Sequence, residues 1–346
     1  MWLKKRPTIT IGFALLALVT ASSCLPKSPM ESAGGVNITL YGFSVMKEPL
    51  ENAIYPAFAA KWKSEHGVDV RFTSSFAGSE TITNQILQGV KAQIGIFSID
   101  RDPQRLKDRG FVTSDWHAFP QKGIVNKTPF VILVRRGNPK GIRDFPDLAK
   151  AGVRLVHPDP ISSGGAQWSI LAMYGSELVK SEKATGEADR TRALQTLQAI
   201  WHNVFSTPAS AREARTTFEL GNGDALVTYE LDALLMKQAS PDADAEIVIP
   251  EATILSEHPV VVIDRNVSAG DRPVIDAFIA YLFTEEAQRD FVKFHFRSST
   301  NDALNQENKE LATIKYPFTV HYFRGWEHAY PEIIEGIFRD QVQQRK

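Results

Sequence analysis

Short apolar runs alternate along most of the chain with segments whose apolar residues recur every three or four positions. The first such segment carries Leu50, Ile54, Phe58 and Trp62 and stops at Gly67, as expected for a helix with a glycine C-cap. Strand-like runs occur at 36–41, 68–72, 94–97, 130–134, 153–156, 224–229 and 260–264. Further helix-like segments lie at 79–87, 168–174, 191–202, 210–218, 272–293 and 329–344. Strands that alternate with helices predict an α/β protein with mixed, mostly parallel sheets flanked by helices.

Polar turns rich in serine and glycine open several of the predicted helices. Four of them stand out: Ser44-Val45, Gly78-Ser79, 162–165 and Ser210-Ala211. Unpaired N–H groups at a helix N-terminus attract anions, and glycine lets the backbone approach a ligand closely. One such turn is often only a helix N-cap. Four of them in one α/β chain predict two lobes that close on a small anion, at the carboxyl ends of strands.

The N-terminal residues have the organisation of an export signal. Lys4, Lys5 and Arg6 precede the apolar run 11–19, which is too short to span a bilayer. Small residues then lead to Cys24, the one cysteine in the chain.

A single cysteine cannot form an internal disulfide, so its place at the end of the signal needs another reason. We expect cleavage before Cys24 and attachment of a lipid to its sulfur, with residues 1–23 as signal peptide and 24–35 as a tether. Ala21 occupies the position where lipobox motifs usually carry Leu. Ordinary signal cleavage a few residues further on is therefore the alternative.

Charge and motif content exclude several classes of function. The chain holds 39 Lys and Arg against 40 Asp and Glu, and the signal removes three of the cations, so a nucleic-acid-binding surface is not expected. No segment after the signal has eighteen consecutive apolar residues. His321 and His328 lack metal-ligand spacing. Neither a nucleophile elbow nor a phosphate-binding loop is present, so we predict a binding protein without cofactor or metal rather than a hydrolase that uses Ser163.

Several stretches match one family in order and spacing. They are 56–62, 76–79, 134–140, 158–168, 217–218 with 223–226, and 323–326. From about residue 36 to the C-terminus the chain resembles the periplasmic sulfate-binding proteins of bacterial sulfate and thiosulfate ABC importers. The resemblance implies a two-lobed, type II periplasmic-binding-protein fold with the ligand between the lobes. Lobe 1 is expected at 36–128 and 259–346 and lobe 2 at 129–258, with the chain crossing near 127–131 and 255–260.

The same resemblance implies which residues bind the anion. Backbone N–H groups, serine hydroxyls and one aromatic side chain hold a dehydrated sulfate in this family, with no need for a cationic side chain. Carried over, the ligand-binding residues are Ser44, Ser79, Ser163, Gly164, Gly165, Ala211 and Tyr229, with Arg212 and Glu80 behind them. Tyr229 occupies the position of the family's tryptophan. The first turn departs most from the family, and Val45 is the alternative to Ser44 there.

Some of these residues have plainer interpretations. Tyr229 could be a core aromatic, Ser79 an N-cap, and Arg212 an exposed helix charge, while Trp168 and Trp326 are better interpreted as packing residues. Glu80 could accept a proton from hydrogen phosphate, or it could stabilise the helix dipole while pointing to solvent.

The departures from the family pattern at Ile161 and Gln167 leave sulfate favoured but keep thiosulfate, molybdate and phosphate open. Those at Tyr229, Glu80 and Gln167 also leave open a sensor or adhesin that does not transport. The implied partner is a membrane permease, and the implied location is the periplasm or the outer face of a bacterial membrane, for a monomer held by its N-terminal lipid.

Overall fold

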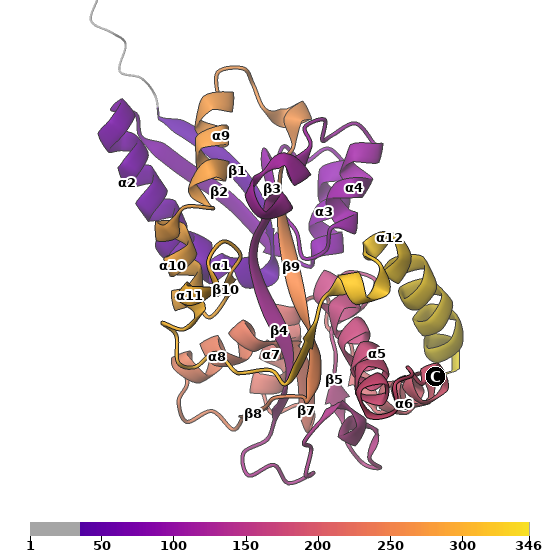
Figure 1. The fold of residues 1–346 in the computed structure, drawn as a ribbon. Helices are drawn as coiled ribbons and strands as arrows, with labels where there is room; N and C mark the ends of the chain where they lie inside the picture. Colours follow the sequence, from indigo (N-terminus) through magenta and orange to yellow (C-terminus); the bar gives the residue numbers. More distant parts are fainter. Residues whose placement is uncertain (1–34, 346) are drawn as a thin grey trace, which may run out of the picture. The chain divides into compact units, whose positions relative to one another are not determined.

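The computed structural model describes residues 35–345 (Figure 1). Cys24, the predicted signal and nearly all of the predicted tether lie outside the described residues. Among the described residues, no helix combines the length and the apolar character needed to cross a bilayer.

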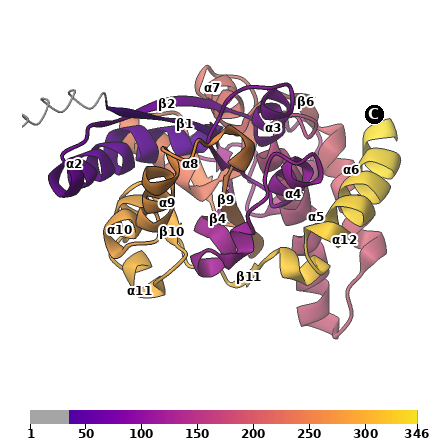
Figure 2. The ribbon, with the colours of Figure 1, turned by 90° about the horizontal axis from the view of Figure 1, so that it is seen from above.

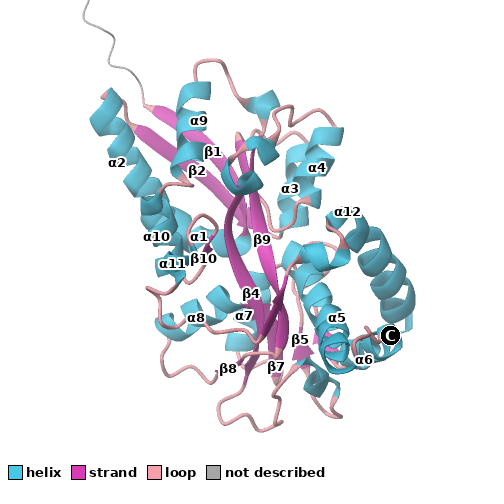
Figure 3. Cartoon of the chain, viewed as in Figure 1, coloured by secondary structure: helices cyan, strands magenta, loops and turns pink. Residues whose placement is uncertain are grey.

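The strands form one mixed sheet, which Figure 3 shows in magenta between the helices. Its order is β2-β1-β3-β9-β4-β7-β5-β6. Along that order the strands are β2 Val70–Ala77, β1 Val36–Phe43, β3 Ile94–Ile96, β9 Ala252–Val262, β4 Ile124–Val134, β7 Ala225–Tyr229, β5 Leu155–Val156 and β6 Val204–Ser206. Off this path, β8 (Glu246–Val248) and β10 (Arg297–Ser298) pair with β4, and β11 (Tyr316–Phe318) pairs with β9. The mixed α/β class is confirmed, but parallel pairings do not predominate. Every pairing of β4 is antiparallel, as is that of β9 with β3.

The long strands β4 and β9 connect the two halves of the sheet. Residues 124–129 of β4 pair with β9, and residues 130–134 pair with β7. Residues 260–262 of β9 continue to β3 in the other half. The crossings predicted near 127–131 and 255–260 therefore fall inside these two strands (Figure 1).

Helices cover both faces of the sheet. They are α1 Lys47–Pro49, α2 Tyr55–His66, α3 Ser79–Leu87, α4 Arg101–Asp108, α5 Gly164–Thr185, α6 Arg190–His202, α7 Ala211–Glu219, α8 Glu230–Ala239, α9 Arg272–Tyr281, α10 Glu285–Lys293, α11 Asp302–Asn305 and α12 Trp326–Ala329. The π-helical segments η2 (Leu50–Ile54) and η8 (Tyr330–Val342) extend α1 and α12. The predicted helix at 272–293 is two helices, because Thr284 has extended backbone and caps α10 by accepting from the Ala287 N–H.

In the half of the sheet that holds β1 and β3, successive side chains point to opposite faces, and each face has its own apolar cluster. On one face Ile38 and Leu40 belong to the cluster that includes Phe58 of α2 and Phe278 of α9. On the other face a second cluster forms under α3 and α4, which lie together on that side in both views (Figures 1 and 2). The buried sheet thereby fixes where the N-termini of α3 and α4 lie.

Candidate anion-binding site

Three of the four polar turns meet in space. A β-carbon on Gly78 would overlap the carbonyl oxygen of Ser162 and lie 2.9 Å from that of Ala209. A β-carbon on Gly164 would lie 3.1 Å from Cβ of Ser79. The N-termini of α3, α5 and α7 are thus brought together, as the sequence predicted. The close packing of backbone against backbone explains why two of these positions are glycine.

The first turn lies beside the fourth. Ser44 begins the 3-10 turn η1 (Ser44–Met46), which packs against α7. Ser44 and Val45 are both buried, and Val45 belongs to the main apolar core. Ser44 as a ligand residue remains a prediction, and the apolar contacts of Val45 assign its side chain to packing.

Ser163 and the two glycines after it begin α5. The Ser163 hydroxyl accepts the Ala166 N–H, the expected N-cap hydrogen bond. As the first residues of the helix, Gly164 and Gly165 have N–H groups without an intrahelical acceptor. Since Ser163 is an acceptor in its cap, its own O–H proton can still be donated to a ligand.

Ser98 was not identified from the sequence, yet it hydrogen-bonds two of the predicted ligand residues, Ser79 and Tyr229. Its N–H donates to Oγ of Ser79 (2.9 Å), and its hydroxyl lies 2.8 Å from the phenol oxygen of Tyr229. Its carbonyl accepts the indole N–H of Trp168 at 2.6 Å. The signal that could have found it is its place directly after β3, where α4 is about to begin.

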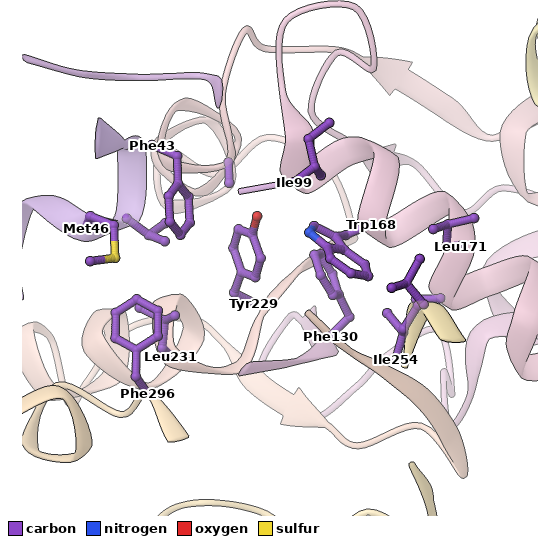
Figure 4. Close-up of a cluster of buried hydrophobic side chains, with 14 of the residues drawn as sticks. Phe43, Met46, Ile99, Phe130, Trp168, Leu171, Tyr229, Leu231, Ile254 and Phe296 are labelled. Carbon is purple, nitrogen blue, oxygen red and sulfur yellow. The ribbon is translucent and has the colours of Figure 1, made fainter. Parts of the chain in front are cut away.

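Tyr229 is fully buried at the end of β7, between Phe43 and Trp168 (Figure 4). A β-carbon on Gly165 would lie 2.8 Å from its phenol oxygen, so the hydroxyl faces the N-terminus of α5. Burial raises the pKa of Tyr229 well above its usual value, which keeps the phenol protonated and able to donate. The core interpretation and the ligand interpretation are therefore compatible, since the ring packs while the hydroxyl faces the converging turns.

Ser79 is both a helix residue and a member of a hydrogen-bonded chain. Its hydroxyl donates to Oδ2 of Asp102 at 2.5 Å and accepts the Ser98 N–H. The N-cap position of α3 is Gly78, so Ser79 is not the N-cap. Asp102, fully buried in the first turn of α4, is a second residue that was not identified from the sequence.

Glu80 is buried, which contradicts the interpretation that it points to solvent. Its carboxylate pairs with Arg101 at 2.9 Å and with Arg105, and Gln167 Nε2 lies 3.3 Å from Oε1. Arg101, Arg105 and Gln167 therefore already donate to the oxygens that a protonated phosphate would need. The Glu80 carboxylate turns inward because Arg101 and Arg105 of α4 pair with it.

Arg212 is likewise not an exposed helix charge. Its guanidinium forms a bidentate pair with Glu48 and lies 3.5 Å from Asp232. Burial disfavours the charged form of Glu48, but Arg212 overrides this and lowers the Glu48 pKa. Ala211 is the first residue of α7, and Ser210 caps the helix by accepting the Glu213 N–H.

The site is rich in uncharged donors. In the described part of the chain, the hydrogen bonds of Ser79, Ser98, Ser163 and Tyr229 involve no lysine, arginine or histidine side chain. Residues 35–345 also hold no group of three or more His, Cys, Asp or Glu placed to bind a metal ion. Trp168 packs edge-to-face on Trp326 with ring centroids 4.7 Å apart, as predicted for packing residues.

Comparison with known proteins bears directly on this arrangement. A family model described as bacterial extracellular solute-binding protein matches residues 38–297. The chain is 33% identical to a sulfate-binding protein of Synechococcus elongatus, over 99% of this chain and 97% of that protein. It is 32% identical to the thiosulfate-binding protein of Escherichia coli, over 83% of each chain.

The solved structures agree with the sequence relatives. The sulfate-binding protein SubI from Mycobacterium tuberculosis H37Rv matches with a TM-score of 0.76 and 28% identity, covering 86% of this chain and 99% of that one. The resemblance to sulfate- and thiosulfate-binding proteins is thereby confirmed, and it carries the extracytoplasmic location of the family with it. The chain belongs to the bacterial extracellular solute-binding protein family.

Proposed function

We propose that this protein captures sulfate, or the related thiosulfate, outside the cytoplasm and presents it to an ABC importer. The observation that supports this most strongly is the convergence of three helix N-termini, with uncharged donors, on one buried point. The relatives that the chain matches over nearly its whole length are sulfate- and thiosulfate-binding proteins.

The donors are sufficient for useful affinity. The N–H groups of Ser79, Gly164, Gly165 and Ala211 and the hydroxyls of Ser163 and Tyr229 would surround the anion. Each charge-assisted hydrogen bond is worth roughly 1.5–3 kcal/mol. Their sum must offset dehydration of a dianion, and a net of about −8 kcal/mol gives micromolar affinity.

The site favours sulfate over hydrogen phosphate. Sulfate carries no proton at neutral pH, whereas hydrogen phosphate needs an acceptor for its own proton. Glu80 is held by Arg101 and Arg105, so its oxygens are not offered to a ligand. A protonated oxyanion would then lack a partner for its proton, which costs binding energy.

The lobes are proposed to be 36–128 with 259–346 and 129–258, joined by β4 and β9. With these limits, the Glu48–Arg212, Glu80–Gln167 and Ser98–Trp168 contacts all join one lobe to the other. These contacts would break when the lobes part to release the anion, as in hinge closure of other binding proteins. A lipid on Cys24 would keep the monomer beside its permease.

Isothermal titration of the purified protein with sulfate, thiosulfate and phosphate tests the proposal. We expect micromolar binding of sulfate or thiosulfate, abolished in Gly164→Val, whose side chain would collide with Ser98 and Ser79. Gly270→Ala is the matched control, because only Ser268 Oγ comes within 4 Å of the added β-carbon, at 3.8 Å. Absence of heat with all three anions would reject the proposal.

A further inference from the structure

Asp102 is a buried carboxylate one hydrogen bond away from the proposed anion. Its Oδ2 accepts the Ser79 hydroxyl at 2.5 Å, and the side chain is fully buried. Within the described part of the chain, Oδ1 of Asp102 has no hydrogen-bond partner, and Nη1 of Arg105 lies 3.7 Å from it. An ionised carboxylate in this place would leave one lone-pair-bearing oxygen unsatisfied and add a negative charge behind a bound dianion.

The charged groups around Asp102 do not offset the cost of an ionised carboxylate there. Glu80 on α3 repels the carboxylate, while Arg101 and Arg105 on α4 attract it. Both arginines already pair with Glu80. From α5, Gln167 reaches Glu80 rather than Asp102, and Tyr330 of η8 covers the guanidinium of Arg101 at 3.7 Å. Burial first, and repulsion from Glu80 second, raise the pKa of Asp102 well above its usual value.

The protonation state of Asp102 decides what Ser79 can do. With an ionised Asp102, the Ser79 proton is donated to the carboxylate and cannot reach an anion. With a protonated Asp102, the acid O–H donates to Ser79 Oγ, which also accepts the Ser98 N–H. Both acceptor positions of the Ser79 hydroxyl are then filled, so its proton must point elsewhere. The N-terminus of α5 is close by, since a β-carbon on Gly164 would lie 3.1 Å from Ser79 Cβ.

We propose that Asp102 is a positioning residue that takes up a proton when the oxyanion binds and thereby directs the Ser79 hydroxyl as a donor to the anion. This inference rests on the proposed function, because it takes a fully ionised oxyanion as the ligand. The proton comes from hydronium in the solvent: one of its O–H bonds breaks as an O–H bond forms on Oδ2 of Asp102, and no other covalent bond changes. Binding is then strongest at pH values below the Asp102 pKa of the empty protein and weakens about tenfold per pH unit above it.

Titration calorimetry with sulfate, followed by infrared spectroscopy of the same sample, tests the inference. In the sulfate complex at pH 7.5, we expect a C=O stretching band of a protonated carboxylic acid that is missing in Asp102→Asn. The Asp102→Asn variant should bind sulfate with an affinity that does not change between pH 6 and 9.5, because its amide stays neutral. Asp108→Asn, an exposed position at the end of the same helix, is the control and should keep the band.

The two proposals fail in different ways. A sulfate complex whose infrared spectrum is the same in wild type and Asp102→Asn would overturn the role of Asp102 and leave the proposed function intact. No binding of sulfate or thiosulfate by the wild type would overturn both. If Asp102→Asn folds poorly, the inference stays testable on the wild type, because a sulfate complex without any band of a protonated carboxylic acid would overturn it. Ser79→Ala is then expected to weaken sulfate binding at least tenfold.

Discussion

The two sides of the proposed site handle charge differently. On the α5 side, Ser163, Gly164 and Gly165 offer only backbone N–H groups and a hydroxyl, and no ionisable group is needed. On the α3–α4 side, Ser79 is backed by Asp102 and by Glu80, with two arginines in pairs. The comparison teaches that a ligand-binding surface of uncharged donors can pack against buried charged residues, provided that each buried charge is paired or neutralised.

The largest effect is expected where the two sides touch. Gly78→Ala places a β-carbon against the Ser162 and Ala209 carbonyl oxygens, which are backbone atoms and cannot rotate away. We expect sulfate affinity to fall at least a hundredfold while thermal stability changes little, because the proposed parting of the lobes would separate Gly78 from Ser162 and Ala209 and relieve the contact. Calorimetry and thermal melting measure the two quantities. An affinity within threefold of wild type would mean that the turns do not close on each other.

The α5 side should depend on the helix N-terminus. Ser163→Ala removes the cap of α5, worth about 1 kcal/mol of folding stability, and also a donor to the anion. We expect a ten- to hundredfold loss of sulfate affinity, with a small drop in melting temperature. Ser163→Thr keeps the hydroxyl and should recover both. A loss of stability without loss of affinity would make Ser163 a cap only.

The Tyr229 hydroxyl is a proposed donor to the anion, and it connects the two sides of the site through Ser98. Tyr229→Phe removes the phenol hydroxyl and leaves Ser98 Oγ without its 2.8 Å partner. We expect about a tenfold weaker sulfate affinity, the cost of one charge-assisted hydrogen bond. Tyr229→Trp should restore part of it, because an indole N–H also donates. Unchanged sulfate affinity in Tyr229→Phe would assign Tyr229 to packing alone.

The smallest effect is expected at the Glu48–Arg212 pair, whose side chains are not among the proposed donors to the anion. Arg212 holds the Glu48 pKa below its ordinary value of 4.5, so the pair stabilises the protein above that pH and the stabilisation is lost as pH falls through the lower, folded-state value. Glu48→Gln should therefore reduce the acid sensitivity of lobe closure and weaken sulfate binding only about threefold at pH 7, as expected for a partly exposed pair. Sulfate titrations from pH 4 to 7 measure it. A pH dependence identical to wild type would remove Glu48 from the closing contacts.

Much of the fold and part of the site followed from local patterns. Apolar periodicity identified the helix that ends at Gly67, whose φ of 70° is the left-handed C-cap expected there. Serine and glycine before helices located the turns around Ser79, Ser163 and Ala211, because that chemistry is local. Strand direction did not follow, since the antiparallel pairings of β4 and β9 are set by distant partners.

The residues whose roles the sequence did not predict contact partners that are distant in the sequence. Ser98 joins Ser79, Trp168 and Tyr229, the last of them 131 positions away. Asp102 is an acid in the first turn of a helix, and its hydrogen bond with Ser79 appears only in the fold. Glu80 was expected to face solvent because its arginine partners on α4 cannot be placed without the fold. Pairing between elements, rather than residue type, decided each case.

The central claim is that uncharged donors hold a fully ionised oxyanion. The most direct test is a titration of the purified protein with sulfate at pH 7.5, repeated in the presence of a large excess of phosphate. The account predicts micromolar sulfate binding that phosphate does not disturb. Phosphate binding that competes with or exceeds sulfate would contradict it, because the site would then have to offer an acceptor for the phosphate proton.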